Sequence, residues 1–172
     1  MRAIAFSALC SCLLALAVAP LSAKPVPPPP IEVGPLTLPQ PPHFRRVEDK
    51  RERLVLQSDS KEAWCRLAVG QRELGDKAEL TKDDCRKLAQ TVHPYLQQPV
   101  GLRWRSQAWL GRPSYALEFS AVEGNRRHFA SYRFTLRGGL LLWCAMICSE
   151  SEKSRWVPIF ESWAKTARWN DL

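Results

Sequence analysis

The stretch LRWRSQAWLGRPSYALEFSAVEGNRRHFASYRFTLRGGLLLWCAMIC, residues 102–148, decides the fold, because apolar residues recur at alternate positions between short glycine-containing turns. This spacing is typical of β-strands, whose successive side chains point to opposite faces. It predicts four antiparallel strands, at 102–110, 115–121, 130–136 and 140–148, joined by tight turns. The last strand is apolar on both faces and is therefore expected to be central in the sheet or covered on both sides.

One further strand and two helices are predicted around this stretch. Residues Trp64 to Gly70 alternate in the same way and predict a strand. From Thr81 to Gln98 the apolar residues follow a helical stripe, with Thr81 as the N-cap, and Pro94 is expected to end or kink the helix near His93. A second helix is expected from Ser154, as its N-cap, to about Trp169. The predicted order β-α-β-β-β-β-α defines an α+β fold, in which two helices pack on an antiparallel sheet of about five strands.

The first 53 residues are expected to lie outside this domain. Residues 1–23 combine an early arginine, an apolar run and terminal small residues, which is typical of a cleaved signal peptide. A membrane anchor and a lipidated Cys12 are the alternatives. Residues 24–53 are rich in proline and then in charge, and predict a largely extended or disordered leader that ends in a short helix or a solvated lead-in. Residues 54–172 then form a single domain, periplasmic or secreted, with no transmembrane span in the mature form.

Four cysteines follow the predicted signal peptide, namely Cys65, Cys85, Cys144 and Cys148. An even number in an exported domain favours structural disulfides, and neither metal-ligand spacing nor a Cys-x-x-Cys motif is present. Cys144 and Cys148 lie about 13 Å apart along one strand, at about 3.3 Å per residue, which is too far for a bond. We therefore expect Cys65 to bridge to one of these two and Cys85 to the other. The spacing leaves open which of the two pairs with Cys65.

No catalytic set is recognised in the sequence. The three histidines, His43, His93 and His128, are scattered and are expected at the surface or at the ends of elements. Glu118 and Glu123 flank a predicted hairpin as solvated acids, and no hydrolase or zinc-binding motif occurs. We therefore predict that the protein is not an enzyme and has no cofactor or metal. An exported hydrolase with an unrecognised site is the alternative function.

The chain is basic, with a formal net charge of +8, and its arginines gather in the predicted hairpins. The candidate binding residues are Arg103, Arg105, Trp109, Arg112, Arg126, Arg127 and Arg133. Guanidinium groups pair with anions and tryptophan is a frequent interface anchor, so this face is suited to an acidic protein or an anionic envelope component. A solvated outer sheet face without a partner is the alternative. Nucleic acid is not expected as a partner of an exported protein, and the oligomeric state stays open.

The sequence also resembles the PsbP-like and DcrB-like group of small exported α+β proteins. The resemblance rests on the Gly138-Gly139 turn, the strand at 140–148, the polar linker Ser149 to Ser154 and the helix from Phe160 to Arg168, and it extends over about residues 63–170. The cysteines and the proline-rich leader depart from the pattern of this group. The resemblance implies an accessory or binding role and carries over no functional residue. We therefore predict an exported non-enzymatic binding protein, either an envelope accessory factor or an inhibitor or immunity protein that acts by surface complementarity.

Overall fold

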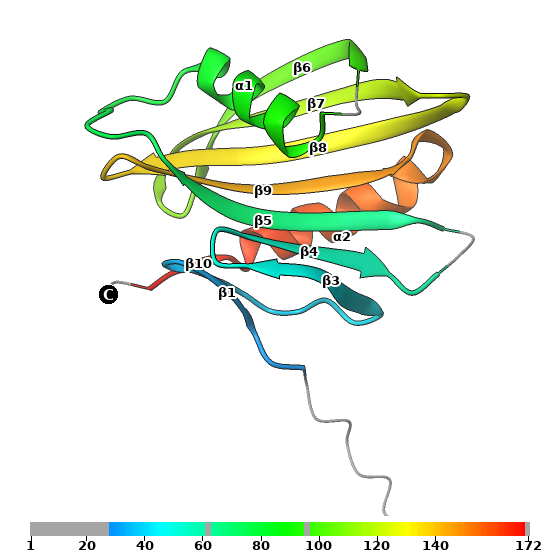
Figure 1. Cartoon of the computed structure of the whole chain (residues 1–172), viewed down its shortest axis with the longest axis horizontal. Coiled ribbons are helices and arrows are strands. Elements are labelled where there is room, and N and C mark those ends of the chain that lie inside the picture. The colour runs from blue at the N-terminus through cyan, green and yellow to red at the C-terminus, as the bar shows by residue number, and fades with distance from the viewer. Residues whose placement is uncertain (1–27, 61–62, 95–96, 171–172) are drawn as a thin grey trace, which may run out of the picture.

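The computed structural model describes residues 28–60, 63–94 and 97–170 and has an α+β architecture (Figure 1). The strands are β1 (Ile31–Val33), β2 (Leu36–Leu38), β3 (Phe44–Lys50), β4 (Arg53–Ser58), β5 (Cys65–Glu73), β6 (Gln97–Trp109), β7 (Arg112–Glu123), β8 (Arg126–Arg137), β9 (Leu140–Ser149) and β10 (Arg168–Trp169). The helices are α1 (Lys82–Val92), the short 3-10 helix η1 (Glu150–Glu152) and α2 (Lys153–Lys165). The predicted signal peptide at 1–23 lies outside the described residues.

Seven strands form one antiparallel sheet in the order β3-β4-β5-β9-β8-β7-β6, and a small second sheet has the order β1-β2-β10. The four strands predicted within residues 102–148 are confirmed as β6 to β9, which follow one another as hairpins. β9 lies between β5 and β8, and the burial of nearly all its residues confirms the central position. The prediction of about five strands was too low, because it left out β3, β4 and the small sheet.

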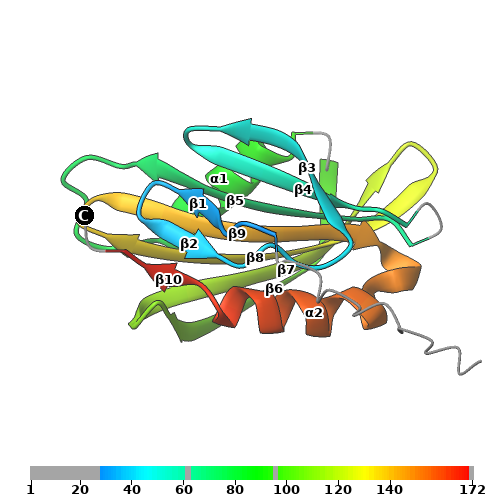
Figure 2. The ribbon, with the colours of Figure 1, turned by 90° about the horizontal axis from the view of Figure 1, so that it is seen from below.

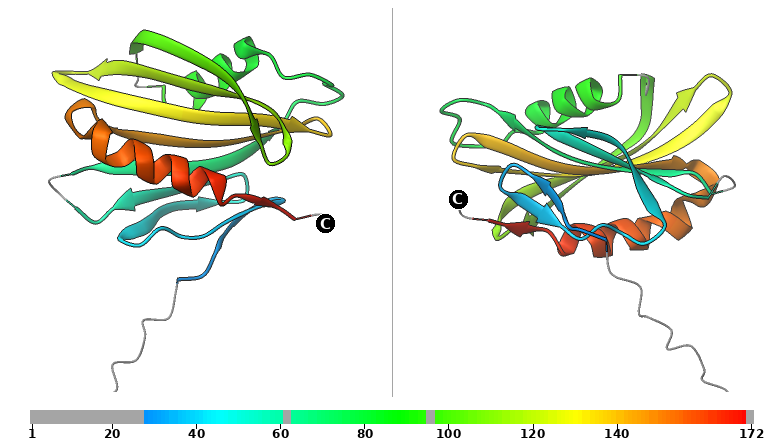
Figure 3. Two further views of the ribbon diagram at one scale, coloured as in Figure 1. Left: turned by 180° about the vertical axis from the view of Figure 1, so that it is seen from behind. Right: turned by 60° about the horizontal axis from the view of Figure 1, so that its bottom comes forward.

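The large sheet separates two apolar cores. α2 and the small sheet cover one face, here called the α2 face, and α1 covers the other, the α1 face (Figure 2 and Figure 3). Successive residues of β9 alternate between them, with Met146 in the core under α2 and Ala145 and Ile147 in the core under α1. The apolar run of this strand is therefore explained by burial on both faces.

The first helix agrees with its prediction at both ends. Thr81 is the N-cap and forms a reciprocal capping box with Asp84. Burial alone raises the pKa of the Asp84 carboxyl, but hydrogen bonds from Lys77 and Thr81 outweigh it and lower that pKa to about 2. The helix ends at Val92, with His93 as the C-cap directly before Pro94. The capping residues and the proline thus delimit this element from the sequence alone.

The stretch before residue 54 is part of the fold, which corrects the predicted leader. β1 and β2 insert fully or almost fully buried side chains into the core under α2, among them Ile31 and Leu36. β3 occupies the segment expected as a short helix or solvated lead-in and pairs with β4. Only Phe44 of β3 is buried, so this charged strand has no alternating apolar pattern by which to recognise it. Charged side chains are common on edge strands, because they discourage further pairing.

The second helix is present where it was predicted, but its ends differ from the prediction. Trp156, Phe160 and Trp163 are buried against the sheet. η1 precedes the helix, which begins at Lys153, so Ser154 lies within the helix instead of capping it. The helix also ends at Lys165 because the chain leaves it to pair as β10 with β2.

All four cysteines named above are buried and unbonded. Cys65, Cys144 and Cys148 lie in the core under α2, whereas Cys85 lies on α1 in the opposite core. The predicted bridge from Cys85 to the last strand is therefore wrong, because the sheet lies between them. Cys144 and Cys148 lie on one continuous strand, as expected.

Candidate functional site

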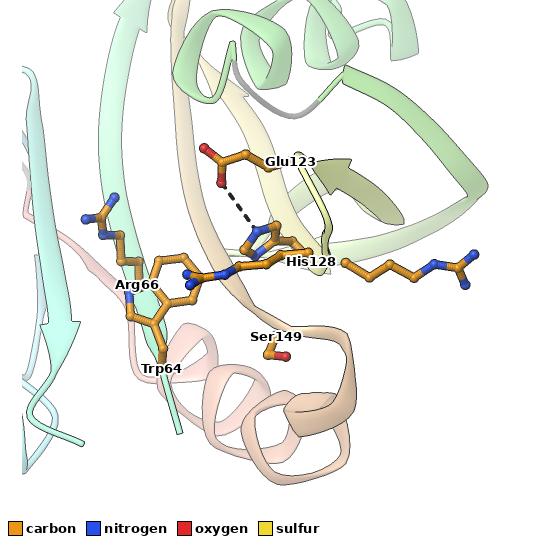
Figure 4. Close-up of a pocket in the computed structure, with 7 residues that line it drawn as sticks. Trp64, Arg66, Glu123, His128 and Ser149 are labelled. Atoms are coloured by element: carbon orange, nitrogen blue, oxygen red, sulfur yellow. Dashed lines mark ion pairs between the residues drawn. The ribbon is translucent and has the colours of Figure 1, made fainter. Parts of the chain in front are cut away.

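A pocket of about 890 Å³ opens at the end of the large sheet where β5 begins and β9 ends (Figure 4). Its walls come from the start of β5, the β7–β8 hairpin and the end of β9. The lining residues are Trp64, Arg66, Glu123, Arg126, Arg127, His128 and Ser149. We call this cavity the hairpin pocket.

Strand register positions the side chains of the hairpin pocket. His128 on β8 lies opposite Ser149 on β9, and opposite residues of antiparallel strands point to the same face. Trp64 directly precedes β5 and Arg66 is its second residue, so the two side chains, two positions apart in extended chain, also share a face. Trp64 packs against the core under α1, which places the pocket on the α1 face.

Trp64 forms the aromatic wall of the pocket. The Arg66 guanidinium carbon lies 5.4 Å from the centroid of the Trp64 ring, and its Nε donates a hydrogen bond to Gln57 Oε1 at 3.2 Å. On the other side, the His128 ring meets Trp64 edge-on, with 5.6 Å between the ring centroids. Cation–π and edge-to-face contacts of this kind restrict the orientation of both neighbours.

Arg126 and Arg127 make no hydrogen bond or ion pair with any residue that the structure describes, and both are exposed. With Arg66 they set three guanidinium groups against the single carboxylate of Glu123. A concave surface with this excess of positive charge attracts anions. Guanidinium groups also bind carboxylate and phosphate groups through two parallel hydrogen bonds. The hairpin pocket is therefore suited to an anionic group.

His128 is 7% exposed, which corrects the expectation of a surface histidine. Its Nε2 lies 3.3 Å from Glu123 Oε2, a contact that becomes an ion pair when the ring is protonated. The alignment does not make a hydrogen bond, so within the described part of the chain neither ring nitrogen has a hydrogen-bond partner. Buried polar atoms normally have one. A polar ligand in the pocket would supply the missing partner.

The pocket also brings together Ser149, His128 and Glu123, residue types that form catalytic triads. In a working triad the serine hydroxyl is hydrogen-bonded to the histidine, which a carboxylate orients. Here Ser149 Oγ is instead hydrogen-bonded to Ser151 Oγ at 3.0 Å, and no hydrogen bond joins it to His128. Nor do three or more His, Cys, Asp or Glu side chains gather as possible metal ligands anywhere in the described ranges.

A second cavity, of about 550 Å³, lies between β6, β7 and the start of α2. Its charged lining residues are the cations Arg103, Arg127 and Lys153 and the carboxylates Glu118 and Glu150, of which Glu150 is ion-paired with Lys153. The rest of the lining is largely apolar, and Val100 is 66% exposed and Val122 is 42% exposed. We call it the apolar groove. Because Arg127 lines both cavities, the groove and the hairpin pocket meet at the β7–β8 hairpin.

The structure distributes the predicted binding residues over several places. Arg126 and Arg127 lie in the hairpin pocket and Arg103 in the apolar groove. Arg112 is exposed at the opposite end of β7, beside the β6–β7 turn. The predicted set is therefore not one surface.

Two of the predicted binding residues, Trp109 and Arg133, are buried, and a third, Arg105, is exposed but ion-paired. Trp109 shares a face of β6 with Arg103 and Arg105, as expected, but α2 covers it, and its Nε1 donates to the Ala164 carbonyl at 2.8 Å. Arg133 is 2% exposed and donates to Glu161 on α2. Burial lowers the pKa of Arg133. Arg105 forms an ion pair with Glu118.

The pocket residues that the sequence analysis did not select are Trp64, Arg66, Glu123, His128 and Ser149. Part of the signal was available, because counting outward from the Gly138-Gly139 turn places His128 opposite Ser149. The register of β5 could not be counted in this way, because no hairpin connects β5 to β9, so the sequence did not place Trp64 and Arg66 beside this pair.

The fold and its pocket define the class of this protein as an α+β domain with a central antiparallel sheet and an open basic cavity. No protein-family model matches the chain, and no curated protein sequence matches it. Several solved structures share the fold.

One is the cyanobacterial PsbP of Synechocystis sp. PCC 6803, with a TM-score of 0.57 and 18% identity over 78% of this chain and 86% of that one. A second is LpqN of Mycobacterium tuberculosis, described as involved in cell envelope biogenesis, with a TM-score of 0.55 and 12% identity over 83% and 90%. A third is a Pseudomonas aeruginosa protein of unknown function, with a TM-score of 0.54 and 12% identity over 80% of this chain and 94% of that one. These likenesses confirm the predicted PsbP-like fold and, at such identities, show the fold alone.

Proposed function

We propose that this protein is an exported, non-enzymatic binding protein that holds an acidic segment of a protein partner in the cell envelope. The observation that carries the proposal is the pair Arg126 and Arg127, which line the same pocket as Trp64 and form no hydrogen bond or ion pair within the described ranges. Arginine and tryptophan are the residue types that most often dominate the energy of protein interfaces.

The apolar groove favours a polypeptide over a simple polyanion as the partner. Val100 and Val122 are exposed there, and the groove continues into the hairpin pocket at Arg127. A polyanion would match the arginines but would leave these apolar side chains in water. A segment that carries both acidic and apolar side chains contacts both cavities at once.

Export is part of this proposal. It is supported by the signal-like sequence at 1–23 and is compatible with the role in cell envelope biogenesis described for LpqN, which shares the fold. In the described ranges, no helix has the length and apolar character needed to cross a membrane.

The test is peptide binding to the purified full-length chain, followed by fluorescence anisotropy. The probes are a labelled short peptide of glutamates and leucines, a poly-glutamate of equal charge and vesicles of anionic lipid. Arg126→Glu/Arg127→Glu is expected to weaken binding of the mixed peptide by at least about tenfold, since each charge-assisted hydrogen bond contributes roughly 1.5–3 kcal/mol.

The matched control is Arg51→Glu/Arg72→Glu, which changes the net charge equally at exposed positions near the other end of β5. It is expected to leave the affinity nearly unchanged. If both double variants lost the same peptide affinity, the effect would be one of net charge, and the hairpin pocket would not be a specific binding site. Tighter binding of poly-glutamate or vesicles than of the mixed peptide would contradict a protein partner.

A hydrolase is the second candidate, because Ser149, His128 and Glu123 line one pocket. Activity on a chromogenic ester that disappears in both Ser149→Ala and His128→Gln would favour it. The binding proposal expects Ser149→Ala to keep the peptide affinity, so the same variant separates the two functions.

A further inference from the structure

Cys65 and Cys148 lie directly opposite each other on the neighbouring strands β5 and β9. Both are fully buried in the core under α2. Opposite residues of antiparallel strands point to the same face, so the two thiols share one side of the sheet.

In an antiparallel ladder, opposite residues are either a hydrogen-bonded or a non-hydrogen-bonded pair, and the backbone hydrogen bonds of β5 decide which applies to Cys65 and Cys148. The backbone N–H of Cys65 donates to Ser58 Oγ at 3.0 Å, on the β4 side. Six residues along β5, the N–H of Gln71 likewise donates to the Glu52 carbonyl at 2.9 Å. The register with β9 is continuous between these positions, so Cys65 turns its backbone groups toward β4 and away from Cys148.

Cys65 and Cys148 are therefore a non-hydrogen-bonded pair, in which the Cα atoms of antiparallel strands lie about 4.5 Å apart. Disulfides need Cα atoms roughly 4.4 to 6.8 Å apart. The pair is thus within bonding reach without a shift of either strand.

The other described cysteines have no such neighbour. Cys144 lies opposite Val69 on β5 and Arg133 on β8. Cys85 belongs to the core on the other side of the sheet. Among the cysteines that the structure describes, the fold thus offers one cross-strand pair.

We propose that Cys65 and Cys148 form a disulfide bond that joins β5 to β9 in the exported protein. The oxidant is a low-molecular-weight or protein disulfide, and the reaction is thiol–disulfide exchange. One cysteine thiolate attacks the oxidant, forms a mixed disulfide and releases one thiol. The second cysteine thiolate then displaces the second thiol. Two cysteine sulfurs are oxidised, the oxidant disulfide is reduced to two thiols, and these take up the two protons.

The burial of both thiols determines when this bond forms. Burial raises the pKa of Cys148 to about 12 and raises that of Cys65 still further above its ordinary range. Thiolates are the attacking species, so exchange is slow once β5 and β9 have packed under α2. The disulfide therefore forms while the chain folds and is afterwards shielded from small reductants.

The same bond would brace the hairpin pocket. Trp64 directly precedes Cys65, and Ser149 directly follows Cys148, each pointing to the opposite face of the sheet. The disulfide lies beneath the pocket and fixes the spacing of these two walls. This inference does not depend on the proposed ligand.

The chain offers a test on the wild-type protein. Cleavage by cyanogen bromide at Met146 separates Cys144 from Cys148, and trypsin then isolates the peptides 62–66, 138–146 and 147–153. The full-length chain is exported from bacteria or refolded with oxidised glutathione, alkylated while denatured but unreduced, and mapped by mass spectrometry. We expect 62–66 linked to 147–153, and Cys85 and Cys144 alkylated.

Free alkylation of Cys65, or its linkage to 138–146 or to another cysteine, would overturn the proposal. A second measurement follows the stability of the folded protein. Reduction is expected to lower Tm by roughly 10 °C, because the bond closes a long loop in the unfolded chain. Cys85→Ala should leave that shift unchanged, whereas an unchanged Tm on reduction of wild type would contradict the bond.

Discussion

At the scale of one residue, His93 ends its helix as predicted and is at the same time buried. It lies at the end of α1, 8% exposed, with Nδ1 hydrogen-bonded to the hydroxyl of the buried Tyr132. Burial, followed by the positive charges of Arg53 and Arg66, lowers the pKa of His93 from 6.5 to about 3. The folded protein therefore holds this imidazole neutral at pH values where an unfolded chain would protonate it.

His93 should make the fold less stable in mild acid. Because the folded pKa is depressed, the unfolded state takes up the proton first, and stability present above pH 6.5 is lost as the pH falls toward 3. We expect this residue to account for a loss of about 2 kcal/mol between pH 7 and pH 5. Urea unfolding of wild type and His93→Gln at both pH values measures it.

The variant is expected to lose correspondingly less stability over this interval than wild type. His43→Asn, at an exposed position whose positive φ of 64° suits asparagine, should keep the wild-type pH dependence. Parallel profiles for wild type and His93→Gln would show that His93 does not carry the acid sensitivity.

Residue chemistry alone does not say which face of a sheet is covered. Alternation correctly placed Trp109 with Arg103 and Arg105 on one face of β6. Whether that face meets water depends on where α2 lies, and α2 covers Trp109 while leaving Arg103 exposed. Arg133 was assigned to the surface for the same reason and is instead buried beside Glu161. Two of the seven candidate surface residues, Trp109 and Arg133, are thus buried although the sequence pattern placed them at the surface.

At the scale of elements, the β8–β9 turn combines a backbone requirement with a close approach. Gly138 and Gly139 both have positive φ, 55° and 74°, as a two-residue hairpin turn demands. A Cβ on Gly139 would also lie 2.0 Å from the backbone carbonyl oxygen of Gly75. A Cβ on Gly138 would have no atom within 4 Å. An alanine at Gly138 would therefore meet backbone strain alone, whereas an alanine at Gly139 would meet both backbone strain and a steric clash.

Gly139→Ala is expected to destabilise the protein more than Gly138→Ala. Positive φ alone costs an alanine about 1 kcal/mol, which is the effect expected at Gly138. At Gly139 the backbone near Gly75 must move as well, so the loss should be on the order of 3 kcal/mol or more. Urea unfolding measures the free energy of unfolding of both variants. Equal losses would show that the backbone at Gly75 can move away from residue 139 at no cost.

Elements joined by tight turns were predictable, and elements joined across the sheet were not. The glycine turns set the register of β7, β8 and β9 by simple counting, which includes the His128 and Ser149 pair of the hairpin pocket. The pairing of β5 with β9 joins residues far apart in the sequence, and its register follows from tertiary packing. This explains why Cys65 could be expected to reach the last strand while its partner stayed open.

At the scale of the whole molecule, the N-terminal strands complete the core under α2. Ile31, Leu36 and Leu38 are fully buried there, and Val33 is nearly so. Hydrogen bonds fix the small sheet to the C-terminal region, from Trp163 Nε1 to the Pro39 carbonyl at 2.8 Å and from Asn170 Nδ2 to Thr37 Oγ1 at 2.6 Å. The boundary expected at residue 54 falls within β4, which pairs with β3 in the same sheet.

A chain that begins at residue 54 should therefore fail to fold cooperatively, whereas one that begins at residue 28 should fold. Each fully buried aliphatic side chain contributes roughly 1.5–3 kcal/mol, so the four in β1 and β2 together contribute about 6 kcal/mol or more. That loss is comparable to the whole stability of a typical domain, about 5–15 kcal/mol. Near-ultraviolet circular dichroism and urea unfolding of the two chains decide the matter. A sharp transition of similar midpoint in both would mean that β1 to β3 are dispensable and that the core under α2 closes without them.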